Sequence, residues 1–126
     1  MKLSVVITTY NAEEWLRKVL YGYSVQTDLD FELVIADDGS SVTTKKVIKE
    51  FSSKFKYPII HVWQPDEGFQ KCKILNKAIL KTNSDYLIFT DGDCIPRKDF
   101  VEKHLKNKEK GYFLSGGYFK LPMFTS

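Results

Sequence analysis

The chain has 126 residues, 43% of them hydrophobic and 28% charged, and a formal net charge of +3. These values exclude an intrinsically disordered chain and allow one globular domain with its own core, so we expect a single domain over residues 1–126. No apolar run approaches the roughly 20 residues of a membrane-spanning helix. The first ten residues lack a signal-peptide cleavage site, which favours a cytoplasmic protein.

The basic residues, 17 lysines and two arginines, form no concentrated stripe of the kind that binds nucleic acid, so nucleic acid is not an expected partner. A mild positive excess suits a soluble enzyme with an anionic substrate, or peripheral contact with the acidic cytoplasmic face of a membrane. The densest basic segment, Lys103–Lys110, is typical of a solvated helix face. Cys72 and Cys94 form no CxxC pair, so we expect reduced structural thiols.

The first half of the chain predicts two strand–helix units. Leu3–Thr9 (LSVVITT) is a nearly continuous β-branched run, as in a strand that is buried on both faces of a parallel sheet. Asn11 is expected to cap the helix that follows, which carries an apolar stripe. Phe31–Ala36 (FELVIA) predicts a second strand, and one of the two serines after it is expected to cap a helix that ends near Phe55.

The second half continues the alternation. In chain order we expect a strand over Pro58–Trp63, a helix over Phe69–Leu80, a strand over Tyr86–Thr90, a helix from Pro96 to Gly111 and a strand over Tyr112–Leu121. This βαβαβαβαβ pattern predicts an α/β fold: a single doubly wound, mostly parallel sheet with helices on both faces.

Polar residues gather at the ends of three of the predicted strands, in the segments Thr8–Asn11, Asp37–Ser40 and Asp91–Asp93. In open parallel sheets, ligands bind beyond the carboxyl ends of the strands, near the point where the strand order reverses. These three segments therefore predict a binding site at one edge of the sheet.

The segment Asp91-Gly92-Asp93 is chemically suited to a hard divalent cation. Its two carboxylates offer oxygen ligands, and Mg²⁺ or Mn²⁺ bound there keeps positions for phosphate oxygens and water. The two acids repel each other unless a metal or a basic partner is present. For the triplet alone, a plain surface turn explains the residues equally well, and the polar ends of the other strands favour the metal site.

The remaining polar side chains suggest a nucleotide. One carboxylate of the Asp37-Asp38 pair can accept a hydrogen bond from a nucleobase N–H, although the segment is also a good turn sequence. Tyr10 can stack on a base. Lys71 and Lys73 can reach a diphosphate, although exposed helices carry lysines in any case. Two further residues, His61 and His104, have no other potential metal ligands near them in the sequence and are expected to be structural.

Taken together, these segments resemble the GT-A-fold family 2 glycosyltransferases over essentially the whole chain. The matching segments are Val5–Asn11, Glu32–Ser41, Gly68–Gln70 with Asn76, and Asp91–Asp93 with Pro96. Val62–Phe69 is closest to the bacterial members that build capsular and surface polysaccharides.

The resemblance implies metal-dependent transfer, with inversion, of a sugar from a nucleoside diphosphate donor, most of all a UDP-sugar, to a hydroxyl of a saccharide or lipid-linked acceptor. The nucleotide-binding residues that it implies are Thr8, Tyr10, Asn11, Asp38, Lys73 and Asp91. It also implies that Asp91 and Asp93 hold Mn²⁺ or Mg²⁺, whose charge stabilises the departing diphosphate. Asn76 is expected to tie the strand-end loops together.

The chain departs from the family pattern in two places. Leu75 stands where many relatives have an arginine, and Lys73 is expected to supply the missing charge. Inverting transfer also needs a carboxylate base, which in the family lies well downstream of the Asp-x-Asp segment. The acids after Asp93 belong to a predicted surface helix; they are Asp99, Glu102 and Glu109. No catalytic base is identified, and we expect the donor half of a truncated GT-A domain.

Two other classes compete with a transferase. The first is a donor-binding module without catalysis of its own. The second is a phospho-acceptor receiver domain, whose acidic pair should close the first strand, whereas Asp37-Asp38 closes the second. A nicotinamide-binding domain is disfavoured because no GxGxxG segment follows the first strand.

Overall fold

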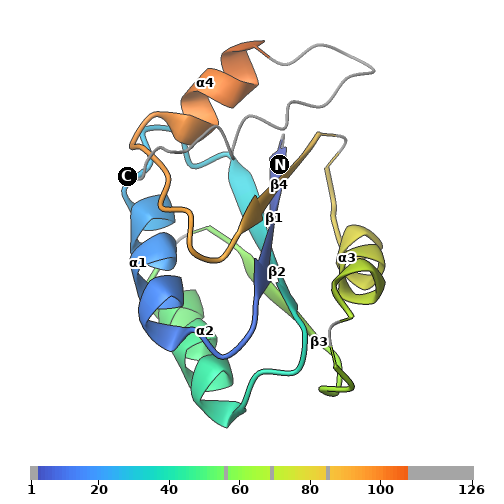
Figure 1. Ribbon diagram of the computed structural model, residues 1–126. Helices are drawn as coiled ribbons and strands as arrows, with labels where there is room; N and C mark the ends of the chain where they lie inside the picture. Colours follow the sequence, from blue (N-terminus) through green and yellow to red (C-terminus); the bar gives the residue numbers. More distant parts are fainter. Residues whose placement is uncertain (1–2, 56, 69, 85, 108–126) are drawn as a thin grey trace.

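The structure, a computed structural model, describes residues 3–55, 57–68, 70–84 and 86–107. Its elements are β1 (Leu3–Thr9), α1 (Glu13–Ser24), β2 (Phe31–Asp37), α2 (Val42–Lys54), β3 (Ile59–Trp63), α3 (Lys71–Ile79), β4 (Leu87–Asp91) and α4 (Phe100–Asn107) (Figure 1). The described strands form one parallel sheet in the order β3-β2-β1-β4. The predicted α/β fold with a doubly wound parallel sheet is therefore confirmed.

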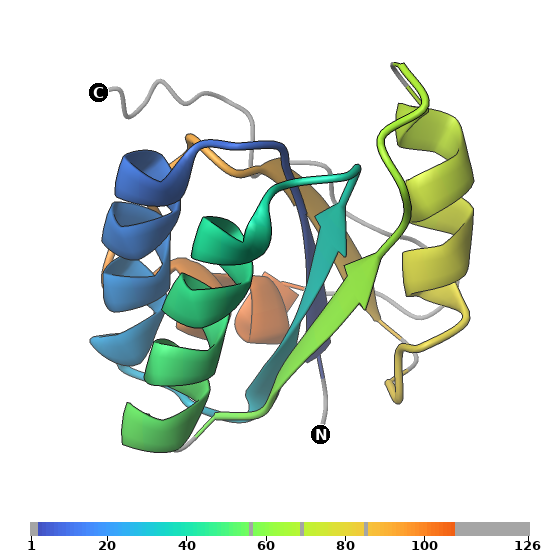
Figure 2. The same ribbon diagram turned by 90° about the horizontal axis from the view of Figure 1, so that it is seen from below.

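The helices cover both faces of this sheet, with α1 and α2 on one side and α3 on the other (Figure 2). The larger core joins Leu3, Val5 and Ile7 of β1 to the inner faces of α1, α2 and α4. The smaller core joins Val6 to Ile74 and other residues under α3. Strand β1 is buried on both faces, which explains why its sequence is a continuous apolar run and does not alternate.

Strand β1 is also the point where the winding of the sheet reverses. The chain moves from β1 to β2 and β3 on one side, then crosses back through α3 to place β4 on the other side of β1. Right-handed crossovers that run in opposite directions place their helices on opposite faces of the sheet. No helix therefore covers the space at the carboxyl ends of β1 and β4, where the two directions meet. The polar segments after these two strands therefore lie at the expected ligand-binding edge.

The prediction that Asn11 caps α1 is wrong. Helix α1 has Ala12 at its N-cap and no side-chain cap hydrogen bond. Asn11 adopts a positive φ of 43°, a conformation that Asn tolerates better than most residues. Its backbone N–H donates to Ser40 Oγ at 2.7 Å, and its Oδ1 accepts the backbone N–H of Ser41 at 2.8 Å. Asn11 thus satisfies an N–H at the start of α2, where the side chain of Ser41 makes no cap hydrogen bond.

The fourth helix begins at Phe100 and not at Pro96, which corrects the predicted start. Pro96 instead packs against α1, so closely that a Cβ on Gly22 would lie 2.8 Å from Pro96 Cδ. The buried Gln26 side chain holds the connection, since its Nε2 donates to the Arg97 carbonyl at 2.6 Å and its Oε1 accepts the Val101 N–H at 2.9 Å. Contacts with α1 therefore set where α4 starts.

Several sequence-based predictions involve residues outside the described ranges. They include the position of Phe69 in the Gly68–Gln70 segment, the end of the fourth helix at Gly111, the strand over Tyr112–Leu121 and the place of Glu109 on a surface helix. Within the described ranges, no helix combines the length and the apolar character that a bilayer crossing requires.

Candidate functional site

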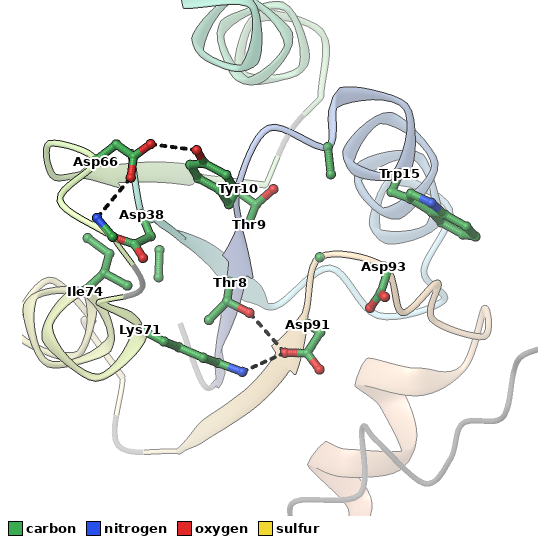
Figure 3. A pocket seen from close by; sticks show the side chains of 14 residues that line it. Thr8, Thr9, Tyr10, Trp15, Asp38, Asp66, Lys71, Ile74, Asp91 and Asp93 are labelled. Carbon is green, nitrogen blue, oxygen red and sulfur yellow. Dashed lines mark hydrogen bonds and ion pairs between the residues drawn. The ribbon is translucent and has the colours of Figure 1, made fainter. Parts of the chain in front are cut away.

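A cavity of about 630 Å³ lies beyond the carboxyl ends of the strands (Figure 3). All three polar strand ends contribute to it, through Thr8 near the end of β1, Asp38 after β2 and Asp91 at the end of β4. The sheet register explains the convergence, because Thr8 pairs with Ala36 of β2 on one side and with Asp91 of β4 on the other. The structure therefore brings together side chains that lie as far as 83 residues apart in sequence.

Asp91 has a hydroxyl and an ammonium as partners within the cavity. Its Oδ1 accepts a hydrogen bond from Thr8 Oγ1 at 3.0 Å and lies 3.2 Å from the Lys71 ammonium (Figure 3). The Asp91 side chain remains 54% exposed, so its other oxygen is accessible from the cavity. Lys71 is the basic partner that the paired acids of the sequence required.

Asp93 and Asp91 lie close enough to share a cation. Their carboxylate oxygens and Cys94 Sγ all lie within 4.8 Å of one another. Two exposed carboxylates at this spacing fit a hard divalent ion. Cys94 is a soft ligand, and burial together with the neighbouring Asp93 raises the pKa of its thiol, which favours the neutral form. Asp91 and Asp93 thus form a candidate acidic cation site, beside which the Cys94 thiol is a softer group.

The Asp37-Asp38 pair divides into a structural and a cavity-facing residue. Asp37 is buried; its Oδ1 accepts the Ser40 N–H at 2.9 Å, and its Oδ2 lies 2.8 Å from His61 Nε2. Asp37 therefore orders the turn after β2, and His61 has the structural position expected from the sequence. Asp38 is the member of the pair that lines the cavity.

The carboxylate of Asp38 is oriented by the segment between β3 and α3. Its Oδ1 accepts Gln64 Nε2 and its Oδ2 accepts the backbone N–H of Gln70, both at 2.8 Å. The Gln64 side chain is almost fully buried, and its Nε2 also donates to the Gln70 carbonyl at 3.2 Å. Each oxygen of a carboxylate has two lone pairs, so Asp38 keeps acceptor capacity towards a ligand. Sequence reasoning did not assign Gln64 to the site, although it lies directly after a strand and within the Val62–Phe69 segment of the resemblance.

Tyr10 forms a rim of the cavity. Its ring is half exposed, and its hydroxyl donates to Asp66 Oδ2 at 2.6 Å. The hydrogen bond to Asp66, together with the charge of that carboxylate, raises the pKa of Tyr10, so the phenol stays neutral. Asp66 also lines the cavity; it belongs to the Val62–Phe69 segment of the resemblance but was not singled out as a site residue.

The two candidate lysines of α3 have different positions. Lys71 lines the cavity, whereas Lys73 is half exposed, lies 4.0 Å from Glu67 Oε1 and does not line it. Two residues rotate a helical position by about 200°, so both lysines cannot face one side. The geometry therefore favours Lys71 over Lys73 as the basic residue of the site.

Two other residues, to which the family resemblance gave a role at the site, also lie away from the cavity. Asn11 does not line it and instead links β1 to the start of α2. Asn76 is exposed on α3, whose buried side carries Ile74 and Ala78, so the expectation that Asn76 ties the strand-end loops together is wrong.

The acids after Asp93 do not approach the cavity within the part of the chain that the structure describes. Asp99 pairs with Arg97 at 3.4 Å and with Lys103 at 3.7 Å. Glu102 accepts Thr27 Oγ1 at 2.6 Å and pairs with Lys106 at 2.8 Å. Glu109 lies outside the described residues. The acids that do line the cavity are Asp38, Asp66, Asp91 and Asp93.

The strand order and the acidic strand ends define an α/β domain of the GT-A type, and the comparison with solved structures agrees. The crystal structure of S. aureus TarS 1–349 superposes with a TM-score of 0.71 at 24% identity, over 84% of this chain and 32% of the TarS 1–349 chain. The sequence model of the family described as glycosyl transferase family 2 matches residues 4–120. The chain therefore belongs to glycosyl transferase family 2.

Curated proteins are similar to this chain in sequence. The uncharacterized glycosyltransferase YfnE of Bacillus subtilis is 34% identical over 110 residues, which is 86% of this chain and 27% of YfnE. A chondroitin synthase of Escherichia coli is 32% identical over 105 residues, or 82% of this chain and 15% of the synthase. The chain therefore spans only about a quarter or less of these proteins' length. The receiver-domain alternative is excluded, because that class has the strand order 2-1-3-4-5 and this sheet has the order β3-β2-β1-β4.

Proposed function

We propose that this chain binds the donor of a metal-dependent glycosyltransferase, which transfers a sugar from a nucleoside diphosphate, in the first place a UDP-sugar, to a hydroxyl of a saccharide or lipid-linked acceptor with inversion. The observation that carries the proposal is the convergence of Thr8, Asp38 and Asp91 on one cavity at the reversal point of the sheet. The family membership supports it.

In this proposal the cavity has a nucleobase side and a diphosphate side. Asp38 and Tyr10 lie on one side, and Asp91 and Asp93 lie on the other (Figure 3). The Asp38 carboxylate, already oriented by Gln64, accepts an N–H of the base, and the exposed Tyr10 ring offers a stacking surface. A UDP donor agrees with the crystal structures of S. aureus TarS, which include complexes with UDP and with UDP-GlcNAc.

The charge of the cavity argues for a cation beside the diphosphate. Four carboxylates and a single ammonium, that of Lys71, line the cavity in the described part of the chain. A diphosphate would be repelled by this surplus of negative charge unless a cation came with it. Asp91 and Asp93 provide the fitting oxygen ligands, and Mn²⁺ or Mg²⁺ held there would stabilise the negative charge of the leaving diphosphate.

Titration calorimetry with UDP, in the presence and absence of Mn²⁺, tests the proposal. We expect UDP to bind the full chain only when Mn²⁺ is present. Asp93→Ala should abolish this binding, and Asp91→Ala should weaken it. Asp99→Ala is the matched control, because Asp99 is a nearby acid outside the cavity. UDP–Mn²⁺ binding of wild-type strength by the double variant Asp91→Ala/Asp93→Ala would exclude the metal site.

A turnover assay beside the titration separates the transferase from a donor-binding module. Hydrolysis of UDP-GlcNAc or its transfer to an acceptor at a rate that falls in Asp93→Ala supports an active enzyme. Binding of UDP–Mn²⁺ without any turnover favours a module that presents the donor and relies on residues elsewhere for the catalytic base.

A further inference from the structure

The two acids of the Asp91–Asp93 pair are not equivalent. Asp91 Oδ1 already has two partners, the Thr8 hydroxyl at 3.0 Å and the Lys71 ammonium at 3.2 Å. Asp93, in contrast, has no cationic partner among residues 3–55, 57–68, 70–84 and 86–107. A cation that binds the pair therefore meets one carboxylate without a cationic partner in the described residues, which the Cys94 thiol contacts at 3.7 Å, and one that already has the Lys71 ammonium as a counter-ion.

We propose that Lys71 is a built-in counter-ion that competes with the divalent cation for Asp91 and passes to the donor diphosphate once that cation binds. The first half of this proposal concerns the chain and a metal ion alone. The second half rests on the proposed function, because it requires a nucleoside diphosphate in the same cavity.

Competition follows from the position of the ammonium. A divalent ion on Asp91 and Asp93 brings two positive charges next to the Lys71 ammonium, which now lies on an oxygen of the same carboxylate. Like charges at such separations repel strongly where water is partly excluded. The cation must therefore displace the ammonium or bind against its repulsion, and either case weakens metal binding in the absence of nucleotide.

Transfer to phosphate follows from the reach of the side chain. Lys71 is the first residue of α3, its side chain is 42% exposed, and a four-carbon stem lets the ammonium move without a change in the backbone. A diphosphate beside Asp91 and Asp93 would give the displaced ammonium a new anionic partner. Metal and nucleotide would then strengthen each other's binding, because each favours the same displaced position of Lys71.

The test compares Lys71→Met with Lys73→Met in two titrations. Binding of Mn²⁺ alone is followed by the electron paramagnetic resonance signal of the free ion, and binding of UDP is followed by calorimetry at saturating Mn²⁺. For Lys71→Met we expect Mn²⁺ to bind about fivefold more tightly and UDP to bind about tenfold more weakly. Lys73→Met removes the same charge from the same helix outside the cavity and should leave both affinities within about twofold of wild type.

The opposite signs of the two changes distinguish a counter-ion from a merely structural lysine, whose loss would weaken both ligands or neither. Lys71→Arg keeps the charge and should restore Mn²⁺ binding to within about twofold of wild type. Unchanged or weaker Mn²⁺ binding in Lys71→Met overturns the proposal, and so does tighter Mn²⁺ binding without any loss of UDP affinity. Failure of the wild-type chain to bind UDP at saturating Mn²⁺ overturns the proposed function and the transfer to phosphate, while the Mn²⁺ titration still decides the competition.

Discussion

Gly92 lies directly against the backbone of Thr8, so that a Cβ added to Gly92 would be 2.5 Å from the Thr8 carbonyl oxygen. The next nearest atom is Thr9 Cβ, at 3.3 Å. This close approach lets the end of β4 lie beside the end of β1, where Thr8 Oγ1 reaches Asp91. The position between the two acids must therefore be a glycine for Asp91 to lie beside Thr8.

Gly92→Ala is expected to push the Asp91–Asp93 turn away from β1. The overlap is with the backbone carbonyl oxygen of Thr8, which cannot rotate away, so we expect a loss of about 1–3 kcal/mol in the free energy of unfolding and a loss of Mn²⁺ binding. Urea denaturation and the Mn²⁺ titration measure the two effects. Gly68→Ala is a useful control, because a Cβ there meets no atom within 4 Å and only the positive φ of 87° is strained. Normal Mn²⁺ binding by Gly92→Ala would show that the close approach is dispensable.

Gln64→Leu is expected to weaken UDP binding through Asp38. Leucine keeps the bulk of this buried side chain but removes the donor that holds Asp38 Oδ1, so the carboxylate loses its fixed orientation. A loss of about 1–2 kcal/mol in binding, or roughly tenfold in affinity, is expected in calorimetry with UDP and Mn²⁺. Gln70→Ala is the control, since Gln70 holds Asp38 through its backbone N–H. Equal UDP affinity of wild type and Gln64→Leu would rule out a role for Asp38 orientation.

Stability is expected to fall as the pH is lowered below about 6.5, with a contribution from His104. Burial lowers the pKa of this side chain, whose Nδ1 has no hydrogen-bond partner in the described residues. Between the ordinary pKa and the lowered one, the unfolded chain binds a proton that the folded chain does not, so stability decreases with falling pH. His104→Leu should therefore lose less stability between pH 7.5 and pH 5.5 than wild type in urea denaturation. An equal loss in both proteins would assign the pH dependence to other groups.

A panel of nucleotides with Mn²⁺ is expected to raise the melting temperature selectively. A ligand that binds only the folded chain stabilises it according to its concentration relative to its Kd. We expect UDP to give the largest shift among UDP, GDP, CDP and ADP, as the proposed UDP-sugar donor requires; Asp38 would accept the ring N–H of uracil, which cytosine and adenine lack. Differential scanning fluorimetry with and without Mn²⁺ gives the ranking. Equal shifts for all four nucleotides would mean that Asp38 does not select the base.

Local patterns predicted the sheet well because they reflect local physics. The run Leu3–Thr9 is apolar at nearly every position, as a strand covered on both faces must be, and its predicted ends match β1. Helix boundaries were less reliable. Proline is common at the first position of a helix, so Pro96 predicted a helix start. Pro96 instead packs against Gly22, and α4 begins at Phe100. Asn11 carries a cap signal, yet its side chain serves Ser41 of another helix.

By itself, the sequence determined that acidic and polar residues stand at the carboxyl ends of three strands, because strand-forming runs and the turns that end them are local features. Only the tertiary structure decided which of these residues face the same cavity. It turns Asp37 inward to His61 and leaves Asp38 towards the cavity, and it brings Lys71 to Asp91. Which side chains face the cavity depends on the register between the strands and on the rotation of α3 about its axis. Contacts between segments that are distant in the sequence set both.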